Sequence, residues 1–277
     1  MHLFIRAIDR TPTQKMYSLI PINEHAAAIA HIITEPESFS IEFGKIYEWL
    51  LAAAAIHSIN INIIQYQRGF GYCEAADEYD ISKEKLTEKF LYKLSIFSLT
   101  WSALECCIDV INPYNYKKNR KNKIKSACLY IDKNFTKSTT LPLLEKEILN
   151  FRRSAETCLG YETVLERFKK CQSRHGQGIY VIYELRNSFA HGDLSFPTPD
   201  ENNQPVSNHH LMLEHATRII LMQIQMLILA YTRYSSEEVN YDWGIFSSEP
   251  EPLWLALRRC HLKPDNPNQM NLFENPE

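Results

Sequence analysis

The pattern of apolar and polar positions along the chain predicts long amphipathic helices. Residues 83–111, KEKLTEKFLYKLSIFSLTWSALECCIDVI, place apolar side chains at spacings of three and four, the period of one helix face. This helix is expected to begin after Ser82 as N-cap and to end at Asn112, because the following proline cannot continue a helix. Residues 45–59, with their alanine run, show the same period and predict an earlier helix.

Three further helices are predicted in the second half of the chain. Residues 141–171 are amphipathic, with Pro142 suited to a first helical turn and Gly160 as a weak point. Residues 178–191 form the next helix, and a polar, proline-containing loop follows it. Residues 209–234 are apolar around most of the circumference, so this helix is expected at the centre of a bundle or at a subunit interface.

The composition agrees with an all-α fold. The 277 residues include only eight glycines, which disfavours a sheet of many short strands. We predict an N-terminal helical extension over residues 1–80, an up-and-down helical bundle over residues 81–235, and an acidic tail over residues 236–277. The tail has eight acidic residues, three basic residues and five prolines. It is expected to be irregular, with one short helix around PLWLALRRC.

Charge and cysteine content restrict the compartment and the partners. The net charge is −3, from 30 basic and 33 acidic residues, so nucleic-acid binding would need a local basic patch. Seven cysteines without a C-x-x-C pair favour a reducing compartment. Arg6, Asp9 and Arg10 interrupt the N-terminus, which therefore lacks the apolar core of a signal peptide. Apolar runs stop short of the ~18 residues that a membrane span needs. We expect a cytoplasmic protein that does not enter a membrane.

Polar residues crowd the end of the helix over residues 178–191, in the run ELRNSFAHGD. Asn187 and His191 are four apart and share a helix face, whereas Arg186 and His191 are offset by roughly 140°. Gly192 suits the left-handed residue that ends many helices, which would let His191 turn. Alternatively, a second copy of the helix across a dimer axis would supply the complementary group.

These three side chains have a defined chemistry in combination. A histidine with a pKa near ~6.5 can take a proton from a ribose 2′-hydroxyl at neutral pH. A guanidinium can hold phosphate oxygens while charge builds on them. The amide of Asn187 can fix the imidazole tautomer or donate to the phosphate. Such a set can cleave RNA without a metal ion or another cofactor.

The run R-N-S-F-A-H resembles the R-x4-6-H motif of the HEPN domains, a superfamily of helical bundles, and asparagine is one of the usual residues after the arginine. The resemblance covers residues 81–235 at most. In HEPN domains the motif ends a late helix and is followed by a loop and a long apolar helix. Residues 192–208 and 209–234 would supply this loop and helix.

The resemblance implies a function. Many HEPN proteins are metal-independent endoribonucleases that act as homodimers with their two motifs facing each other, and they leave a 2′,3′-cyclic phosphate and a 5′-hydroxyl. They recur in toxin–antitoxin and antiviral abortive-infection systems. We therefore expect Arg186, Asn187 and His191 to be catalytic, RNA to be the substrate, and an antitoxin or regulatory protein to be a further partner. A tyrosine follows the histidine in the branch silenced by nucleotidyltransferase antitoxins, but GDLSF follows His191 here, which disfavours that control.

Two other interpretations of the motif stay open. Some HEPN domains have lost catalysis and act as scaffolds, so the bundle would bind a partner protein or a nucleotide. In the other interpretation, Arg186 and His191 are an ordinary helix end, where basic side chains stabilise the helix dipole.

Further candidates lie outside the motif. Glu105, beside the apolar stripe of residues 83–111, is a candidate for orienting Arg186, or a boundary glutamate exposed to water. Residues 117–137 hold eight basic residues and one aspartate, so they either follow an RNA backbone or form a solvated face. The candidate RNA-binding residues are Lys117, Lys118, Arg120, Lys121, Lys123 and Lys125. His209, His210 and His215 lack the helical i, i+4 spacing of zinc sites, so no metal is expected.

Overall fold

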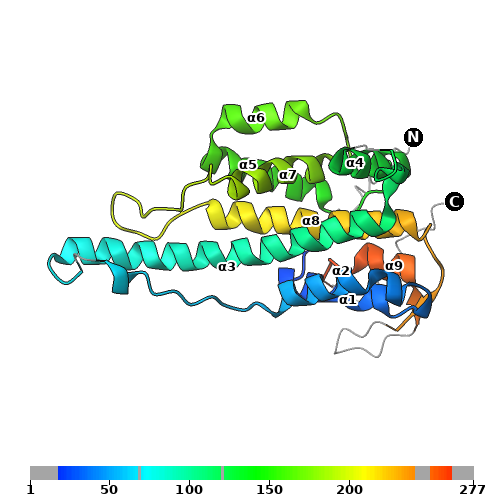
Figure 1. The fold of residues 1–277 in the computed structure, drawn as a ribbon, viewed down its shortest axis with the longest axis horizontal. Coiled ribbons are helices and arrows are strands. Elements are labelled where there is room, and N and C mark those ends of the chain that lie inside the picture. The colour runs from blue at the N-terminus through cyan, green and yellow to red at the C-terminus, as the bar shows by residue number, and fades with distance from the viewer. Residues whose placement is uncertain (1–17, 68–69, 120–121, 241–249, 264–277) are drawn as a thin grey trace, which may run out of the picture.

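Helices make up most of residues 18–67, 70–119, 122–240 and 250–263, the parts of the chain that the computed structural model describes (Figure 1). The all-α prediction is therefore confirmed. The helices are α1 (Ile22–Thr34), α2 (Glu37–Ala55), α3 (Glu74–Ile111), α4 (Lys123–Asn134), α5 (Leu144–Leu159), α6 (Tyr161–Lys170), α7 (Gln177–Ala190), α8 (His209–Tyr231) and α9 (Leu253–Arg259). Two short 3-10 turns, Ile64–Tyr66 and Pro113–Asn115, flank α3.

The apolar helix α8 lies at the centre of the fold. Every residue from Ala216 to Ala230 is buried. Figure 1 shows α8 between a layer of α4, α5, α6 and α7 on one side and α1, α2 and α9 on the other, with α3 alongside. The central position predicted from the mostly apolar circumference is confirmed, because a helix that is apolar around most of its circumference can lose its contact with water only when it is surrounded.

Helix α3 begins nine residues earlier than the sequence pattern indicates. It starts at Glu74, with Cys73 as N-cap, and Ser82 lies inside the helix rather than capping it. The segment between them contains no glycine or proline, and the acidic Glu74 and Asp77 in the first turn favour the positive end of the helix dipole. The N-terminal half of α3 projects beyond the other helices (Figure 1).

The stretch over residues 141–171 forms two helices rather than one. Gly160 lies at φ +85°, a backbone conformation that other residues rarely adopt, and it separates α5 from α6. Helix α5 begins at Leu144, so Pro142 precedes the helix instead of occupying its first turn. The resulting hairpin places α6 over α7. A residue of α6 can therefore contact the run ELRNSFAHGD at the end of α7.

The described part of the C-terminal stretch is built into the core. Two short antiparallel strands, β1 (Glu238–Val239) and β2 (Glu251–Pro252), lead into α9, the short helix expected around PLWLALRRC. Its Leu253 and Leu257 belong to the same hydrophobic core as residues of α1, α2, α3 and α8. The expected short helix is therefore present, and it packs on the core.

A buried polar network joins α1 and the residues after α9 to α8. On α1, His25 Nε2 lies 2.8 Å from Gln225 Oε1, and its Nδ1 lies 2.9 Å from a guanidinium nitrogen of Arg218. Arg218 also donates to the carbonyl of Ile20. Gln225 reaches His261, 3.3 Å away, beyond α9. These contacts satisfy polar groups that would otherwise be costly to bury, so they fix α1 and the C-terminal stretch against α8.

Candidate functional site at the end of α7

The polar run ELRNSFAHGD ends α7 as the sequence predicts. Gly192, at φ +73°, is the left-handed residue, and its N–H donates to the carbonyl of Phe189 at 3.2 Å. His191 is the C-cap residue and donates its N–H to Asn187, while Asp193 donates to Ser188. These bonds use carbonyls that the helix itself leaves unpaired, so the backbone at His191 is defined.

Part of the motif faces inward and holds the helix in place. Leu185 and Ser188 are buried, and Ser188 Oγ accepts a hydrogen bond of 2.8 Å from Arg167 on α6. Phe189 packs between Phe90 and Phe97 of α3, with ring centroids 6.0 Å from each. Arg167 could not be predicted as a partner of Ser188, because nothing in the linear sequence pattern relates α6 to α7. These contacts determine which face of α7 remains available to a ligand.

The other part of the motif faces outward. Arg186 and Asn187 are partly exposed, and His191 is exposed. Among the residues that the structure describes, their side chains make no hydrogen bond or ion pair. Three polar side chains that can bind a phosphate or move a proton are therefore free to contact a ligand.

The straight helix keeps Arg186 and His191 on different flanks. At about 100° per residue, Asn187 and His191 project to one side and Arg186 to another. Tyr183, almost one turn before Arg186, stacks on Trp101 of α3 with ring centroids 6.2 Å apart. Arg186 therefore lies on the flank that borders α3, and His191 lies on the flank turned away from it. One chain alone does not bring the two groups together.

Glu105 lies away from Arg186. Tyr183 faces Trp101, and the C-terminal end of α7 faces Phe90 and Phe97, so α7 runs antiparallel to α3. Glu105 is one turn beyond Trp101 towards the start of α7, whereas Arg186 follows Tyr183 towards its end. The orienting role expected for Glu105 has no support within one chain.

The structure describes four of the six basic candidates for RNA binding, Lys117, Lys118, Lys123 and Lys125, while Arg120 and Lys121 lie outside the described residues. Asp109 forms ion pairs with Lys117 at 3.3 Å and with Lys123 at 2.8 Å. Burial alone would raise the pKa of Asp109, but its hydrogen bonds to Lys123 and Tyr116 outweigh burial and lower it. The charges of Lys117 and Lys123 are therefore already paired with a carboxylate of the same chain.

The basic segment lies at the opposite end of α7 from His191. Helix α4 packs against the start of α7, where Asp132 accepts hydrogen bonds from the N–H groups of Arg174 at 3.1 Å and His175 at 2.7 Å. The 14 residues of α7 span about 21 Å at ~1.5 Å per residue. Within one chain, the basic segment and the motif are therefore separate features.

Two of the three histidines of α8, His209 and His215, contact different partners. His209 lies 2.9 Å from the hydroxyl of Ser207, and His215 lies 2.8 Å from the carboxylate of Glu147. Burial lowers the pKa of His209 and of His210, and the charge of Lys89 adds to the effect on His210. At neutral pH the side chains of His209 and His210 are therefore uncharged.

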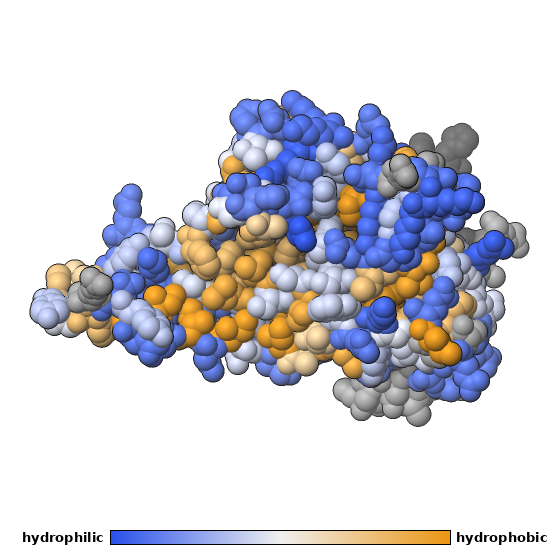
Figure 2. All heavy atoms as spheres, viewed as in Figure 1, coloured by the Kyte–Doolittle hydropathy of each residue, from blue (hydrophilic) through white to orange (hydrophobic). Residues whose placement is uncertain are grey.

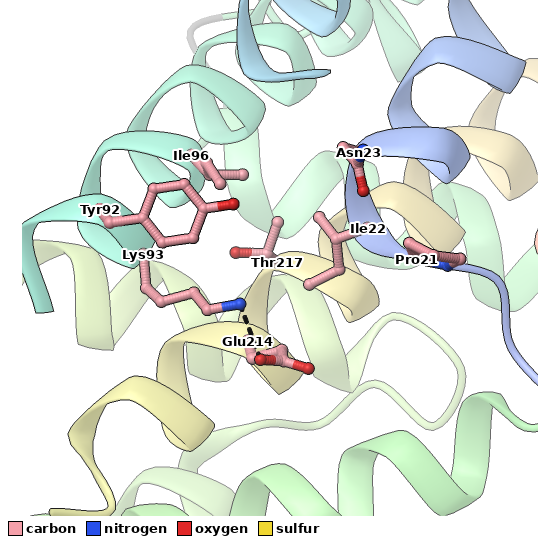
Figure 3. Close-up of a pocket in the computed structure, with 8 residues that line it drawn as sticks. All are labelled: Pro21, Ile22, Asn23, Tyr92, Lys93, Ile96, Glu214 and Thr217. Carbon is pink, nitrogen blue, oxygen red and sulfur yellow. Dashed lines mark ion pairs between the residues drawn. The ribbon is translucent and has the colours of Figure 1, made fainter. Parts of the chain in front are cut away.

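A pocket of about 170 Å³ opens between α1, α3 and α8 (Figure 3). Lys93 and Glu214 form an ion pair of 2.8 Å across it, with Tyr92 and Thr217 beside them. Burial would raise the pKa of Glu214, but the hydrogen bond and charge of Lys93 lower it. The charge of Lys93 is therefore neutralised by the protein, and the pocket lies on the other side of α3 from Arg186.

Apolar residues lie along α3, the helix against which the end of α7 packs. Figure 2 shows hydrophobic residues gathered along α3 and between α3 and the neighbouring helices, with hydrophilic residues mainly towards the edges. Leu94 and Phe189 are only partly buried there.

Comparison of the chain with protein-family models, curated proteins and solved structures gives no match. The interpretation of the site therefore depends on its residues and their surroundings.

Replacing Gly192 tests whether the helix end positions His191. We expect Gly192→Ala to cost about 1 kcal/mol of unfolding free energy, because it forces a side chain into the left-handed region while meeting no atom within 4 Å. The RNA cleavage that the motif predicts should fall by more than this loss of stability explains, since His191 shifts. Gly44→Ala, at an open position inside α2, is the matched control and should leave cleavage unchanged. Equal cleavage by both variants would contradict a positioning role.

Proposed function

We propose that this protein is a metal-independent endoribonuclease of the HEPN type, acting as a toxin or as an antiviral abortive-infection effector. The main support for the proposal is that the motif at the end of α7 has one part that faces inward and one part that faces outward. Its apolar residues and Ser188 are used in packing, whereas Arg186, Asn187 and His191 are accessible and unpaired within the described chain. A helix end with a purely structural role does not need three such groups.

The proposed reaction needs only these side chains. His191 takes the proton of a ribose 2′-hydroxyl or delivers a proton to the leaving group. The 2′-oxygen forms a bond to phosphorus, the bond from phosphorus to the 5′-oxygen breaks, and that oxygen gains a proton. Arg186 holds the phosphate oxygens as their charge increases, and Asn187 orients the imidazole or donates to the phosphate. The products are a 2′,3′-cyclic phosphate and a 5′-hydroxyl.

The site is proposed to form from two copies of the chain. Arg186 and His191 leave opposite flanks of α7, and the flank with Arg186 borders partly exposed apolar surface of α3. A second copy whose α7 end lies against this α7 end would bring its own His191 to Arg186, so that groups separated on one helix meet across the two-fold axis.

Arginine replacement tests the proposed function. Wild-type protein in EDTA should cleave RNA, and Arg186→Ala should reduce the rate by about 10²- to 10³-fold because phosphate charge loses its donor. Arg186→Lys keeps the charge but loses the planar fork, so it should recover only part of the rate. Arg153→Ala, an exposed arginine of α5, is the matched control and should cleave like wild type.

Two results would contradict the proposal. The first is folded wild-type protein that leaves RNA intact in EDTA at every protein concentration. The second is an Arg186→Ala variant as active as Arg153→Ala. Expression should also inhibit growth for wild type and not for Arg186→Ala, which separates the nuclease from a silent binding module.

A further inference from the structure

Arg167 on α6 lies beside the motif without being part of it. Val164 is buried on the inner face of α6, and Arg167, three residues later, lies on the same face. Its Nη2 donates a hydrogen bond of 2.8 Å to Ser188 Oγ on α7. Figure 1 shows α6 lying over α7. A cation of one helix is therefore held against the end of the other.

Arg167 and His191 lie on the same flank of α7. At about 100° per residue, His191 is offset from Ser188 by about 60°, whereas Arg186 is offset from Ser188 by about 160°. Side chains three apart on a helix are neighbours, with Cβ atoms about 5–6 Å apart. The guanidinium that bonds to Ser188 is therefore next to His191 of the same chain, and Arg186 is on the other flank.

The guanidinium of Arg167 has more donors than its contact with Ser188 uses. A guanidinium has five N–H groups, and the printed contact with Ser188 uses one nitrogen. Glu184 and Asp193 are the carboxylates nearest to Ser188 in the sequence, and neither forms an ion pair with Arg167 in the part of the chain that the structure describes. Arg167 is partly exposed, so its remaining N–H groups can contact a ligand.

Arg152 on the neighbouring helix α5 is a contrasting case. Its Nε donates a bond of 2.8 Å to the carboxylate of Glu156, and its guanidinium lies over the ring of Phe168, 5.5 Å from the centroid. The charge of Arg152 is therefore balanced within the chain. Arg167 differs, because it bonds to a neutral hydroxyl, which needs only one neutral donor. Its unbalanced charge indicates an anionic ligand.

We propose that Arg167 is a second phosphate-binding arginine of the ribonuclease site, which holds oxygens of the cleaved phosphodiester beside His191 of the same chain. This role rests on the proposed function. Each site then contains His191 and Arg167 of one copy and Arg186 of the other. The two guanidinium groups balance the charge that develops on the phosphate oxygens while the 2′-oxygen attacks.

Binding of an RNA that cannot be cleaved tests Arg167 apart from catalysis. The probe is a short fluorescent RNA with 2′-O-methyl groups, which lacks the attacking hydroxyl. Arg167→Ala should raise its Kd by about tenfold or more, and should lower the salt dependence of log Kd by about 0.7, the value for one phosphate contact with a single strand. Arg153→Ala, at an exposed position of α5, is the matched control and should bind like wild type.

Ser188→Ala distinguishes a phosphate contact from a structural one. It removes the hydroxyl that Arg167 contacts and leaves the guanidinium present. Its Kd should stay within about threefold of wild type. Arg167→Lys should regain part of the affinity that Arg167→Ala loses, because it keeps the charge without the planar fork. Equal losses in the two alanine variants, with both folded by urea unfolding, would assign Arg167 to helix packing and overturn the proposal.

Mixed dimers test which copy supplies each group. Arg167→Ala mixed with Arg186→Ala gives heterodimers with one intact site, so cleavage should recover to about a quarter of the wild-type rate, since half of the dimers have one of two sites. Arg167→Ala mixed with His191→Ala gives no intact site and should stay at the rate of the single variants. Recovery by the second mixture would place Arg167 and His191 of one site on different copies and overturn the same-chain pair.

Binding and cleavage together separate the role of Arg167 from the proposed function. Wild-type protein that binds the 2′-O-methyl RNA through Arg167 but cleaves no RNA supports the phosphate contact and contradicts the nuclease. Wild-type protein that cleaves RNA, with an Arg167→Ala variant that cleaves and binds like Arg153→Ala, overturns the role of Arg167 and supports the nuclease. Folded wild-type protein that neither binds nor cleaves RNA overturns both.

Discussion

Replacing His191 by alanine should reduce RNA cleavage by about 10²- to 10⁴-fold, which is the contribution expected of a side chain that transfers a proton in the transition state. His191 is exposed and is the C-cap residue of α7, so its loss removes little packing. The free energy of unfolding should therefore change by less than about 0.5 kcal/mol. Cleavage in EDTA, measured beside urea unfolding, separates the two effects.

A matched variant makes this result specific. His31→Ala replaces an exposed histidine on α1, on another part of the surface. It should cleave RNA at the wild-type rate. If both histidine variants lost activity equally, or if His191→Ala kept more than half of the wild-type rate, His191 would not be the proton-transfer group. His191→Gln should be inactive as well, because an amide keeps hydrogen bonding without a titratable proton.

Acid should weaken the fold through the buried network on α8. Burial, aided by the charge of Arg218, holds the pKa of His25 well below its ordinary value. Burial also lowers the pKa of His261 to about 3. Since both pKa values are lower in the folded chain, the unfolded chain binds protons first as the pH falls. The stabilisation is complete above about pH 6.5 and is lost progressively below it.

The expected size of the acid effect is large. Each histidine should contribute a slope of up to ~1.4 kcal/mol per pH unit in the unfolding free energy between about pH 6 and pH 4. Urea unfolding of wild type at a series of pH values should show this slope. The double variant His25→Gln with His261→Asn should show a flatter profile in the same range. An equally steep profile in the double variant would assign the acid sensitivity to other groups.

The sequence pattern predicts the helices well where burial alone decides their position. The apolar circumference of α8 placed it at the centre, and the glycine after His191 predicted the end of α7. The start of α3 was missed because residues 74–82 are polar and have no apolar period, yet nothing in them breaks a helix. The short helix α9 was predicted, but its packing on the core through Leu253 and Leu257 was not, because that contact joins segments distant in the sequence.

The candidate site could be predicted only as far as it is local. The motif residues, their spacing and the glycine stop are visible in the sequence. Contacts between distant segments are not visible there, and these include the bond from Arg167 to Ser188 and the stacking of Tyr183 on Trp101. For the same reason the sequence left Glu105 open as either an orienting residue for Arg186 or a boundary glutamate, whereas the antiparallel direction of α7 and α3 separates the two residues.

The chemistry of the cleaved RNA ends tests the central claim most directly. A short RNA labelled at both ends should be incubated in EDTA with purified wild-type protein and, separately, with His191→Ala. Wild type should yield fragments with a 2′,3′-cyclic phosphate and a 5′-hydroxyl, because the attacking oxygen belongs to the ribose, and His191→Ala should yield none. Fragments with a 3′-hydroxyl and a 5′-phosphate, or intact RNA with folded wild-type protein, would contradict the account.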